Sequence, residues 1–232
     1  MTEIKKENNI SDMAEIPQLS QEELASLKII YPGMQQREVL NAFRDLRAKL
    51  VQKNRASNFV LLVSSLNVGG GGSFVAMNMA ASFALDEGKT SIYIDCNDEN
   101  SFANKVLSDV GGHGLMDYLG NEELGIKDII YSSGIPRVRM IPLGISGDTS
   151  VERIASHRMK KLIASLKARY EDRFIVLDVP SVSSSSLARI LSHEVDMAVL
   201  VVPFGKVTTN QVMAGVDAVG EDKFAGLVFN ND

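Results

Sequence analysis

The sequence predicts an α/β fold in which helices cover both faces of a mainly parallel, doubly wound sheet. Apolar runs of strand length alternate with helix-length segments from Phe59 to the end of the 232-residue chain. Several runs consist of consecutive Val, Ile and Leu residues, a pattern typical of strands that are buried on both faces. A helical segment before Phe59 is expected to form an N-terminal extension.

Composition sets limits on the function. The apolar share of 45% is normal for a globular core, and the net charge of −5 gives no support for a nucleic-acid partner. The single cysteine, Cys96, excludes a disulfide framework within the chain. The sequence has neither an apolar run of about 18 residues nor the pattern of a signal peptide, so we expect a cytoplasmic protein.

The chain is expected to have three parts. Residues 1–35 are predicted to form a mobile N-terminal segment, because the first part of this stretch is polar and mixed in charge. Residues 36–57 are predicted to form a helix and a linker, and residues 58–232 the main domain. The helix, over 36–53, would bury an apolar stripe made of Val39, Phe43, Leu46 and Leu50.

The main domain is expected to alternate strands with helices. The predicted strands are Phe59–Val63, Ser91–Ile94, Val138–Ile141, Phe174–Leu177, Met197–Val202 and Ala225–Phe229. The predicted helices are Phe74–Glu87, Val151–Tyr170, Ser185–Leu191 and Thr209–Val219. In a doubly wound fold, ligands bind at the carboxyl ends of the strands, so the residues that follow each strand are the first candidates for a site.

The first strand leads into a glycine-rich turn and then into a helix, which is the layout of a phosphate-binding P-loop. Successive backbone N–H groups and the helix N-terminus could hold an anion there. The candidate nucleotide-binding residues are Gly69, Gly70, Gly71, Gly72 and Ser73. A P-loop ends in Gly-Lys-Ser/Thr, but Gly72 stands at the lysine position. The alternative interpretation is a plain flexible turn.

Two aspartates directly follow predicted strands. Asp95 ends one apolar run and Asp178 ends another. Such residues can hold Mg²⁺ or orient water, although a lone aspartate more often caps a helix or forms a turn. Together with the Ser73 hydroxyl, Asp95 and Asp178 would form the shell of a Mg²⁺-nucleotide site.

These motifs together resemble the bacterial tyrosine kinases (BY-kinases) of polysaccharide export, within the MinD/ParA-like P-loop ATPases. The resemblance covers about residues 36–230. Arg44 and Arg47 match both arginines of the family's Glu-x-x-Arg-x-x-Arg helix, which bridges subunits, although the glutamate is missing. Asp178-Val179-Pro180 matches the family's third motif. The resemblance implies a P-loop NTPase fold and a subunit contact through Arg44 and Arg47.

The departures from the family pattern fall at positions that carry the chemistry in the family. Gly72 replaces the lysine, Phe74 a threonine and Asn97 an aspartate. Losing the lysine removes a charge-assisted contact to the phosphate that is worth roughly 1.5–3 kcal/mol of binding. Losing its stabilisation of the transferring charge would lower the rate by about a hundred- to a thousandfold. Phe74 also places an apolar ring where the first helical turn would face the α-phosphate.

The resemblance and its departures favour a catalytically degenerate scaffold or regulator in exopolysaccharide or capsule biosynthesis or export, rather than an enzyme. ATP or ADP with Mg²⁺ would bind weakly or not at all. Partners would be proteins of a polysaccharide complex, including a membrane-bound activator at the inner membrane, and further copies of the chain. Two alternatives remain open: an active ATPase or tyrosine kinase that uses another lysine, such as Lys160 or Lys161, and a MinD/ParA-like positioning protein.

Overall fold

The computed structural model describes residues 18–99, 101–107, 112–144 and 151–231. Its strands are β1 Val60–Ser65, β2 Thr90–Asp95, β3 Tyr131–Ser132, β4 Val138–Ile141, β5 Arg173–Asp178, β6 Met197–Pro203 and β7 Phe224–Asn230. They form one seven-stranded sheet in the order β3-β4-β2-β5-β1-β6-β7. The β3–β4 pair is antiparallel and the other pairs are parallel. The predicted mainly parallel sheet is therefore confirmed.

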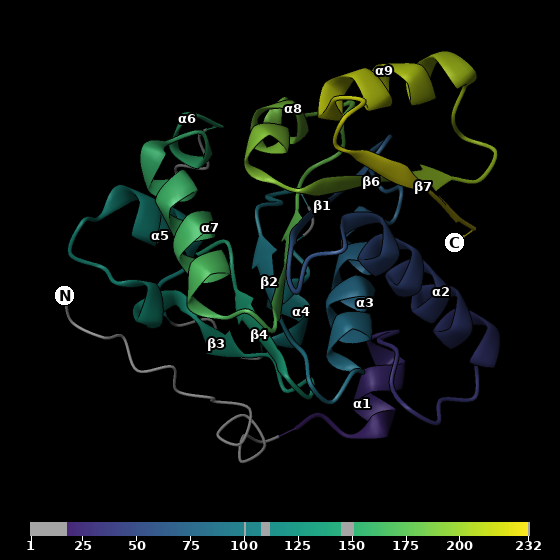
Figure 1. The fold of residues 1–232 in the computed structure, drawn as a ribbon, viewed down its shortest axis with the longest axis horizontal. Helices are drawn as coiled ribbons and strands as arrows, with labels where there is room; N and C mark the ends of the chain where they lie inside the picture. The colour runs from purple at the N-terminus through teal and green to yellow at the C-terminus, as the bar shows by residue number, and fades with distance from the viewer. Residues whose placement is uncertain (1–17, 100, 108–111, 145–150, 232) are drawn as a thin grey trace.

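Helices cover both faces of this sheet (Figure 1). They are α1 Gln21–Ser26, α2 Arg37–Asn54, α3 Gly72–Ala84, α4 Ala103–Val106, α5 Leu115–Gly120, α6 Val151–Ile154, α7 His157–Arg169, α8 Leu187–Leu191 and α9 Thr209–Val219, with the 3₁₀ helices η1 Ile126–Ile129 and η2 Ser192–Glu194. Within the described ranges, no helix is both long enough and apolar enough to cross a membrane.

Two separate apolar cores result from the alternation of side chains along the strands. Leu61 and Val63 of β1 pack in the core that includes α1, α2 and α3. Val60 and Leu62, one residue out of phase, pack in the core that includes α5, α7 and α8. A strand with both faces buried must be apolar throughout, which is the pattern that the sequence displays.

The expected elements are present with small shifts of their ends, and one helix is divided. β4 and α9 have the predicted bounds. The predicted helix over 151–170 is two helices, α6 and α7, because the Ser156 side chain accepts a hydrogen bond from the Met159 amide and caps α7. β3, α1, α4 and α5 were not expected, since segments of two to six residues carry no clear periodicity.

The segment just before α2 differs from the expected mobile N-terminus over residues 18–35. Ser20 and Glu23 form a capping box at the start of α1. Leu24, Ile29 and Ile30 are buried in the same core as α3. Burial of these apolar side chains stabilises the folded segment, although the composition of the N-terminal stretch is polar overall. Residues 1–17 lie outside the described residues, and the division into three parts stays a prediction.

Helix α2 packs on α3 through a face that differs slightly from the predicted stripe. Leu40, Phe43 and Leu50 are buried, whereas Val39 is 38% exposed. The prediction was wrong for Val39, because Leu40 satisfies the same helical spacing and turns toward the core in its place. The ring of Phe43 meets that of Phe74 on α3 edge to face, with centroids 6.0 Å apart. The helix therefore covers its own domain.

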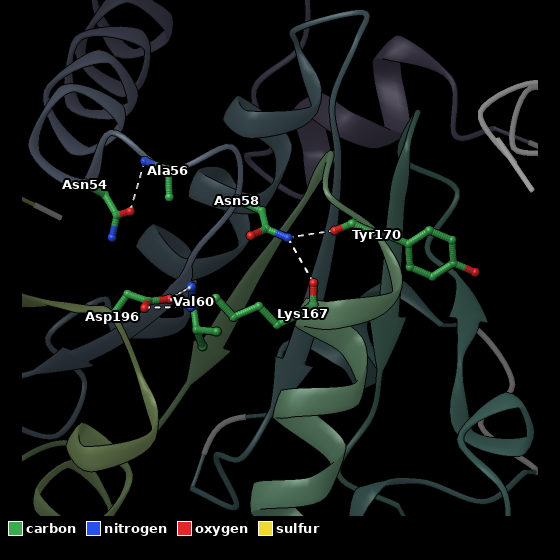
Figure 2. A network of polar contacts seen from close by, with 7 residues as sticks. All are labelled: Asn54, Ala56, Asn58, Val60, Lys167, Tyr170 and Asp196. Atoms are coloured by element: carbon green, nitrogen blue, oxygen red, sulfur yellow. Dashed lines mark hydrogen bonds and ion pairs between the residues drawn. The ribbon is translucent and has the colours of Figure 1, made fainter. Parts of the chain in front are cut away.

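A polar network fixes the start of β1 (Figure 2). The Asn58 amide donates to the carbonyl oxygens of Lys167 (3.1 Å) and Tyr170 (2.7 Å) at the end of α7. Asp196 accepts from the Val60 amide at 2.8 Å and forms an ion pair with Lys167. This network sets the position from which β1 runs to the glycine-rich turn.

Candidate functional site

The glycine-rich turn joins the end of β1 to the start of α3. Gly69 and Gly71 have positive φ values of 70° and 88°, and Gly71 is the N-cap of α3. A Cβ atom at Gly71 would also collide with the Asn230 side chain. The positive φ favours glycine at this position, and a larger residue would also require the Asn230 carboxamide to move.

Contacts from three directions hold the turn in one shape. The Ser65 hydroxyl donates to the Asn67 carbonyl at 2.8 Å. The Asn67 amide donates to the Lys206 carbonyl at 3.0 Å, and the Asn230 amide donates to the Gly70 carbonyl at 3.3 Å. The turn is thus tied to β1, to the loop after β6 and to β7. A plain flexible linker would not need these hydrogen bonds to three separate elements.

Asp178 lies beside this turn and is fully buried. Its Oδ2 accepts a hydrogen bond of 2.5 Å from the Tyr93 hydroxyl, and its Oδ1 has no hydrogen-bond partner in the described part of the chain. Burial, with a smaller contribution from the charge of Asp95, raises the pKa of Asp178 to about 8. A buried acceptor without a partner is costly, so it marks a position at which a cation or a donor would be stabilised.

Asp95 is paired with Asp178 in the register of β2 and β5, but its oxygens are engaged. Oδ1 accepts from the Asn97 amide at 3.0 Å, and Oδ2 accepts from the Ser101 hydroxyl at 2.7 Å and the Ala103 amide at 3.2 Å. Burial raises the pKa of Asp95 to about 6, while these hydrogen bonds act in the opposite direction. Asp95 therefore shapes the loop after β2, which is the turn-forming role considered above.

Ser73 and Asn97 complete the polar cluster. The Asn97 amide donates to the Ser73 hydroxyl at 3.1 Å, and both side chains lower the pKa of Asp178. The three residues of the predicted Mg²⁺ shell, Ser73, Asp95 and Asp178, are therefore gathered at one edge of the sheet. Their oxygen chemistry suits Mg²⁺, with Ser73 and Asp178 the better placed to hold it. In the described ranges, no group of three or more His, Cys, Asp or Glu side chains could hold a metal ion.

A cavity of about 530 Å³ lies over the turn. All five predicted residues, Gly69–Ser73, line it, together with Phe74 and Asn97. Two lysines, Lys28 and Lys105, also line it. Neither was predicted from the sequence, because both are brought to the cavity by folding of segments with no motif. Phe74 was expected to face a phosphate, and its ring also packs against Phe43.

The other candidate cations lie elsewhere. Lys160 on α7 forms a 2.8 Å ion pair with Glu194, and neither Lys160 nor Lys161 lines the cavity over the turn. Arg47 donates to the Ser82 carbonyl of α3 at 2.6 Å, whereas Arg44 is exposed. The two arginines therefore have different surroundings, and Arg47 makes a contact within its own chain.

No protein-family model matches the chain. Tyrosine-protein kinase CpsD of Streptococcus agalactiae serotype III (strain NEM316) is 25% identical to it over 211 residues, which cover 89% of each chain. The homologues of this chain are bacterial tyrosine kinases. This confirms the resemblance that the motifs indicated.

Solved structures of these kinases and of MinD have the same fold. The kinase domain of Escherichia coli tyrosine kinase ETK matches with a TM-score of 0.78 and 21% identity, covering 94% of this chain and 82% of that one. MinD of Pyrococcus horikoshii, complexed with Mg-ADP, matches with a TM-score of 0.61 and 20% identity, covering 74% of this chain and 69% of that one. The predicted P-loop NTPase fold is therefore confirmed.

Proposed function

We propose that this chain is a catalytically degenerate relative of the bacterial tyrosine kinases, acting as a scaffold or regulator in exopolysaccharide or capsule biosynthesis or export. The observation that carries the proposal is Gly72. It is the first residue of α3, directly before Ser73, in a turn that otherwise keeps the P-loop layout. The lysine that would stabilise transferring charge is missing from this position.

The surroundings of the two best metal ligands also support a loss of catalysis. Asn97 donates its amide hydrogen to Ser73, and Tyr93 donates its hydroxyl hydrogen to Asp178. A carboxylate at position 97 would accept from Ser73 and leave its oxygen available to a cation. A Mg²⁺ ion would therefore compete with a donor at the Ser73 hydroxyl and at Asp178 Oδ2, while Asp178 Oδ1 has no hydrogen-bond partner in the described part of the chain.

The link to polysaccharide rests on the relatives and on the motif resemblance. The relatives include CpsD, and the motifs match kinases of polysaccharide export. If the chain has the same setting, it acts in the cytoplasm and reaches the inner membrane through a partner protein.

We further propose that α2 supplies a contact between copies of the chain or with a homologous kinase, through Arg44. This side chain is exposed on α2, whereas Arg47 is used within the chain. An exposed arginine can reach an acidic surface, although a single exposed ion pair contributes only about 0–1 kcal/mol. Several identical contacts in an oligomer would add to one another.

A complementation experiment separates a scaffold from an enzyme. A strain that lacks the chain is expected to lose surface polysaccharide, and the wild-type chain to restore it. Asp178→Asn keeps the size of the side chain but removes the carboxylate on which kinase chemistry would depend. A scaffold predicts that Asp178→Asn restores the polysaccharide and that Arg44→Glu does not. Failure of Asp178→Asn at normal protein abundance would contradict the proposal.

A further inference from the structure

Three arginines surround the side chain of Tyr170, the residue that directly follows α7. The guanidinium carbon of Arg173 lies 3.8 Å from the centroid of the Tyr170 ring, and that of Arg169 lies 5.5 Å from it. Burial lowers the pKa of Arg139 on β4, whereas the nearby Tyr170 oxygen acts in the opposite direction. One aromatic side chain therefore has cations from α7, β4 and β5 around it.

The sheet brings two of these arginines to the same face. Arg139 of β4 pairs with Ile92 of β2, and Arg173 of β5 pairs with Thr90 of β2. Thr90 and Ile92 are two residues apart on one strand, so the side chains at these registers point to one face of the sheet. Ile92 belongs to the core that includes α7. Both arginines are therefore on the face that α7 covers.

The backbone of Tyr170 is anchored, while its side chain points toward these cations. The Asn58 amide donates to the Tyr170 carbonyl at 2.7 Å, and Figure 2 shows the Tyr170 ring directed away from Asn58. Tyr170 is half-buried, whereas Arg173 is only 6% exposed. Rotation of the Tyr170 side chain can therefore bring its hydroxyl to solvent without a change in the anchored backbone.

The surroundings of Arg173 favour an added negative charge. Its Nε donates to the Thr90 hydroxyl at 3.3 Å, which uses one of the five N–H groups of the guanidinium. Burial lowers the pKa of Arg173, while the Tyr170 oxygen and the charge of Asp172 oppose this effect. The neighbouring charge of Arg139 lowers the pKa of Arg173 further. A dianion between the two arginines would offset their repulsion and accept charge-assisted hydrogen bonds from both.

Tyr131 has surroundings of the opposite charge. Its hydroxyl donates to the His113 carbonyl at 2.8 Å. Burial raises the pKa of Tyr131, and the charges of Asp117 and Asp128 raise it further. A phosphate group on the Tyr131 oxygen would be repelled by these two carboxylates. The electrostatic surroundings therefore distinguish Tyr170 from Tyr131, although both side chains are half-buried.

The surroundings of Tyr93 and Tyr118 also differ from those of Tyr170. Tyr93 is fully buried and donates its hydroxyl hydrogen to Asp178. Tyr118 is 7% exposed and has the Arg158 guanidinium 4.2 Å from its ring centroid. Arg158 already donates to two backbone carbonyls in the loop after α5. A phosphate group would have to be buried at either of these tyrosines.

We propose that Tyr170 is a phosphorylation site, and that Arg139, Arg169 and Arg173 hold the phosphate group on its oxygen. The bound phosphate would tie the turn between α7 and β5 to β4. This site lies at the amino ends of β4 and β5, whereas the glycine-rich turn follows the carboxyl end of β1. The proposal therefore goes beyond the proposed function and does not depend on it.

The phosphate group comes from ATP through a tyrosine kinase other than this chain. The Tyr170 oxygen attacks the γ-phosphorus, and an O–P bond forms as the bond from that phosphorus to the β,γ-bridging oxygen breaks. ADP leaves, and the phenolic proton passes to a base of the kinase. Tyr170 rotates away from the arginines for this step and returns with its phosphate group.

Mass spectrometry of the full chain, isolated from its own cells in the presence of phosphatase inhibitors, tests whether the modification occurs. The peptide that contains Tyr170 should carry a phosphate group, and the peptide that contains Tyr131 should not. A chain without phosphate, or with phosphate confined to other tyrosines, would overturn the proposal. It would leave Tyr170 with the purely structural role of covering the buried Arg173.

Phosphotyrosine introduced at position 170 during protein synthesis tests the role of the arginines without any kinase. The second pKa of a phosphotyrosine is ordinarily about 6. Phosphorus NMR at a series of pH values should give a pKa lower by about one unit or more at position 170, because the arginines favour the dianion. Arg139→Gln should reverse much of this shift, and Arg139→Lys, which keeps the charge, should retain more of it.

Phosphotyrosine introduced at position 131 is the matched control. Its second pKa should be equal to the ordinary value or higher, because Asp117 and Asp128 disfavour the dianion. An unshifted pKa at position 170, or the same lowering at both positions, would refute the role of the arginines. Equal values for Arg139→Gln and the wild type at position 170 would exclude Arg139 from the phosphate site.

Discussion

The Asn78 side chain and the Lys28 carbonyl are joined by a 3.1 Å hydrogen bond between α3 and the segment after α1. The same carboxamide accepts from Ile30 and donates to the Phe74 carbonyl, so its polar atoms are all engaged. One buried side chain thus connects the N-terminal segment to the helix that follows the glycine-rich turn.

Asn78→Ala should destabilise the protein by about 2–3 kcal/mol, because it leaves the buried Ile30 amide without its acceptor. Denaturant unfolding gives the free energy, and hydrogen exchange should show faster exchange in residues 24–30 than elsewhere. Asn58→Ala is the control, because Asn58 also bonds two carbonyls but at the start of β1. It should lower stability without selectively exposing residues 24–30. The same exchange pattern in both variants would contradict the role of Asn78.

Gly72→Lys should increase the affinity for Mg-ATP, and more so when combined with Phe74→Thr. A Cβ atom at Gly72 would lie 3.1 Å from the Ser65 amide nitrogen, so the turn needs to move by only a few tenths of an ångström. The added charge-assisted contact should give roughly tenfold or more in affinity, measured by calorimetry. The matched control is Lys161→Gly, which should leave the affinity unchanged. An absence of gain in the folded double variant would mean that the turn no longer has P-loop geometry.

Stability should fall as pH rises toward 8, because of Asp178. In an unfolded chain this carboxyl loses its proton near its ordinary pKa of 3.8, whereas burial raises the folded pKa to about 8. Between these values the folded state binds more protons, so raising the pH disfavours it. Each unit of pKa difference corresponds to about 1.4 kcal/mol.

Asp178→Asn should therefore make stability less dependent on pH over this interval and increase it most near pH 8, as measured by denaturant unfolding at a series of pH values. The exposed Asp222→Asn is the control and should follow the wild-type curve. Parallel curves for wild type and Asp178→Asn would show that Asp178 does not keep its proton.

Arg44→Glu should weaken self-association or docking to a homologous kinase, detected by light scattering over a range of protein concentrations. The expected change in dissociation constant is up to about tenfold, since exposed ion pairs are individually weak. Lys161→Glu makes the same charge change on α7 and should have no effect. Arg47→Glu is less informative, because it would also place a carboxylate near the Ser82 carbonyl. A chain that remains monomeric and binds no partner, with or without Arg44→Glu, would contradict the proposal.

The fold could be predicted from the sequence where the pattern of side chains is local. β4 is apolar except at Arg139, and α9 has a capping box formed by Thr208 and Gln211. Both elements have the predicted bounds. The pattern was insufficient where two residues satisfied the same spacing. Val39 and Leu40 both fit an apolar stripe on α2, and only packing against α3 selects Leu40.

The site could be predicted where its residues lie at the carboxyl ends of strands. Ser73, Asp95 and Asp178 lie together because parallel strands bring their carboxyl ends to one edge. Lys28 and Lys105 could not be predicted, because one depends on Asn78 and the other on the loop that Asp95 holds. These are contacts between segments far apart in sequence. The role of the site residues in binding a ligand stays a prediction.

ATP turnover by the purified full chain is the decisive measurement for the proposed loss of catalysis. The chain is incubated with Mg²⁺ and γ-labelled ATP, and both released phosphate and label on tyrosine are measured in parallel with the Asp178→Asn variant. We predict no phosphate release above that of Asp178→Asn and no labelled tyrosine. Hydrolysis or tyrosine labelling that the wild type shows and Asp178→Asn abolishes would contradict the claim.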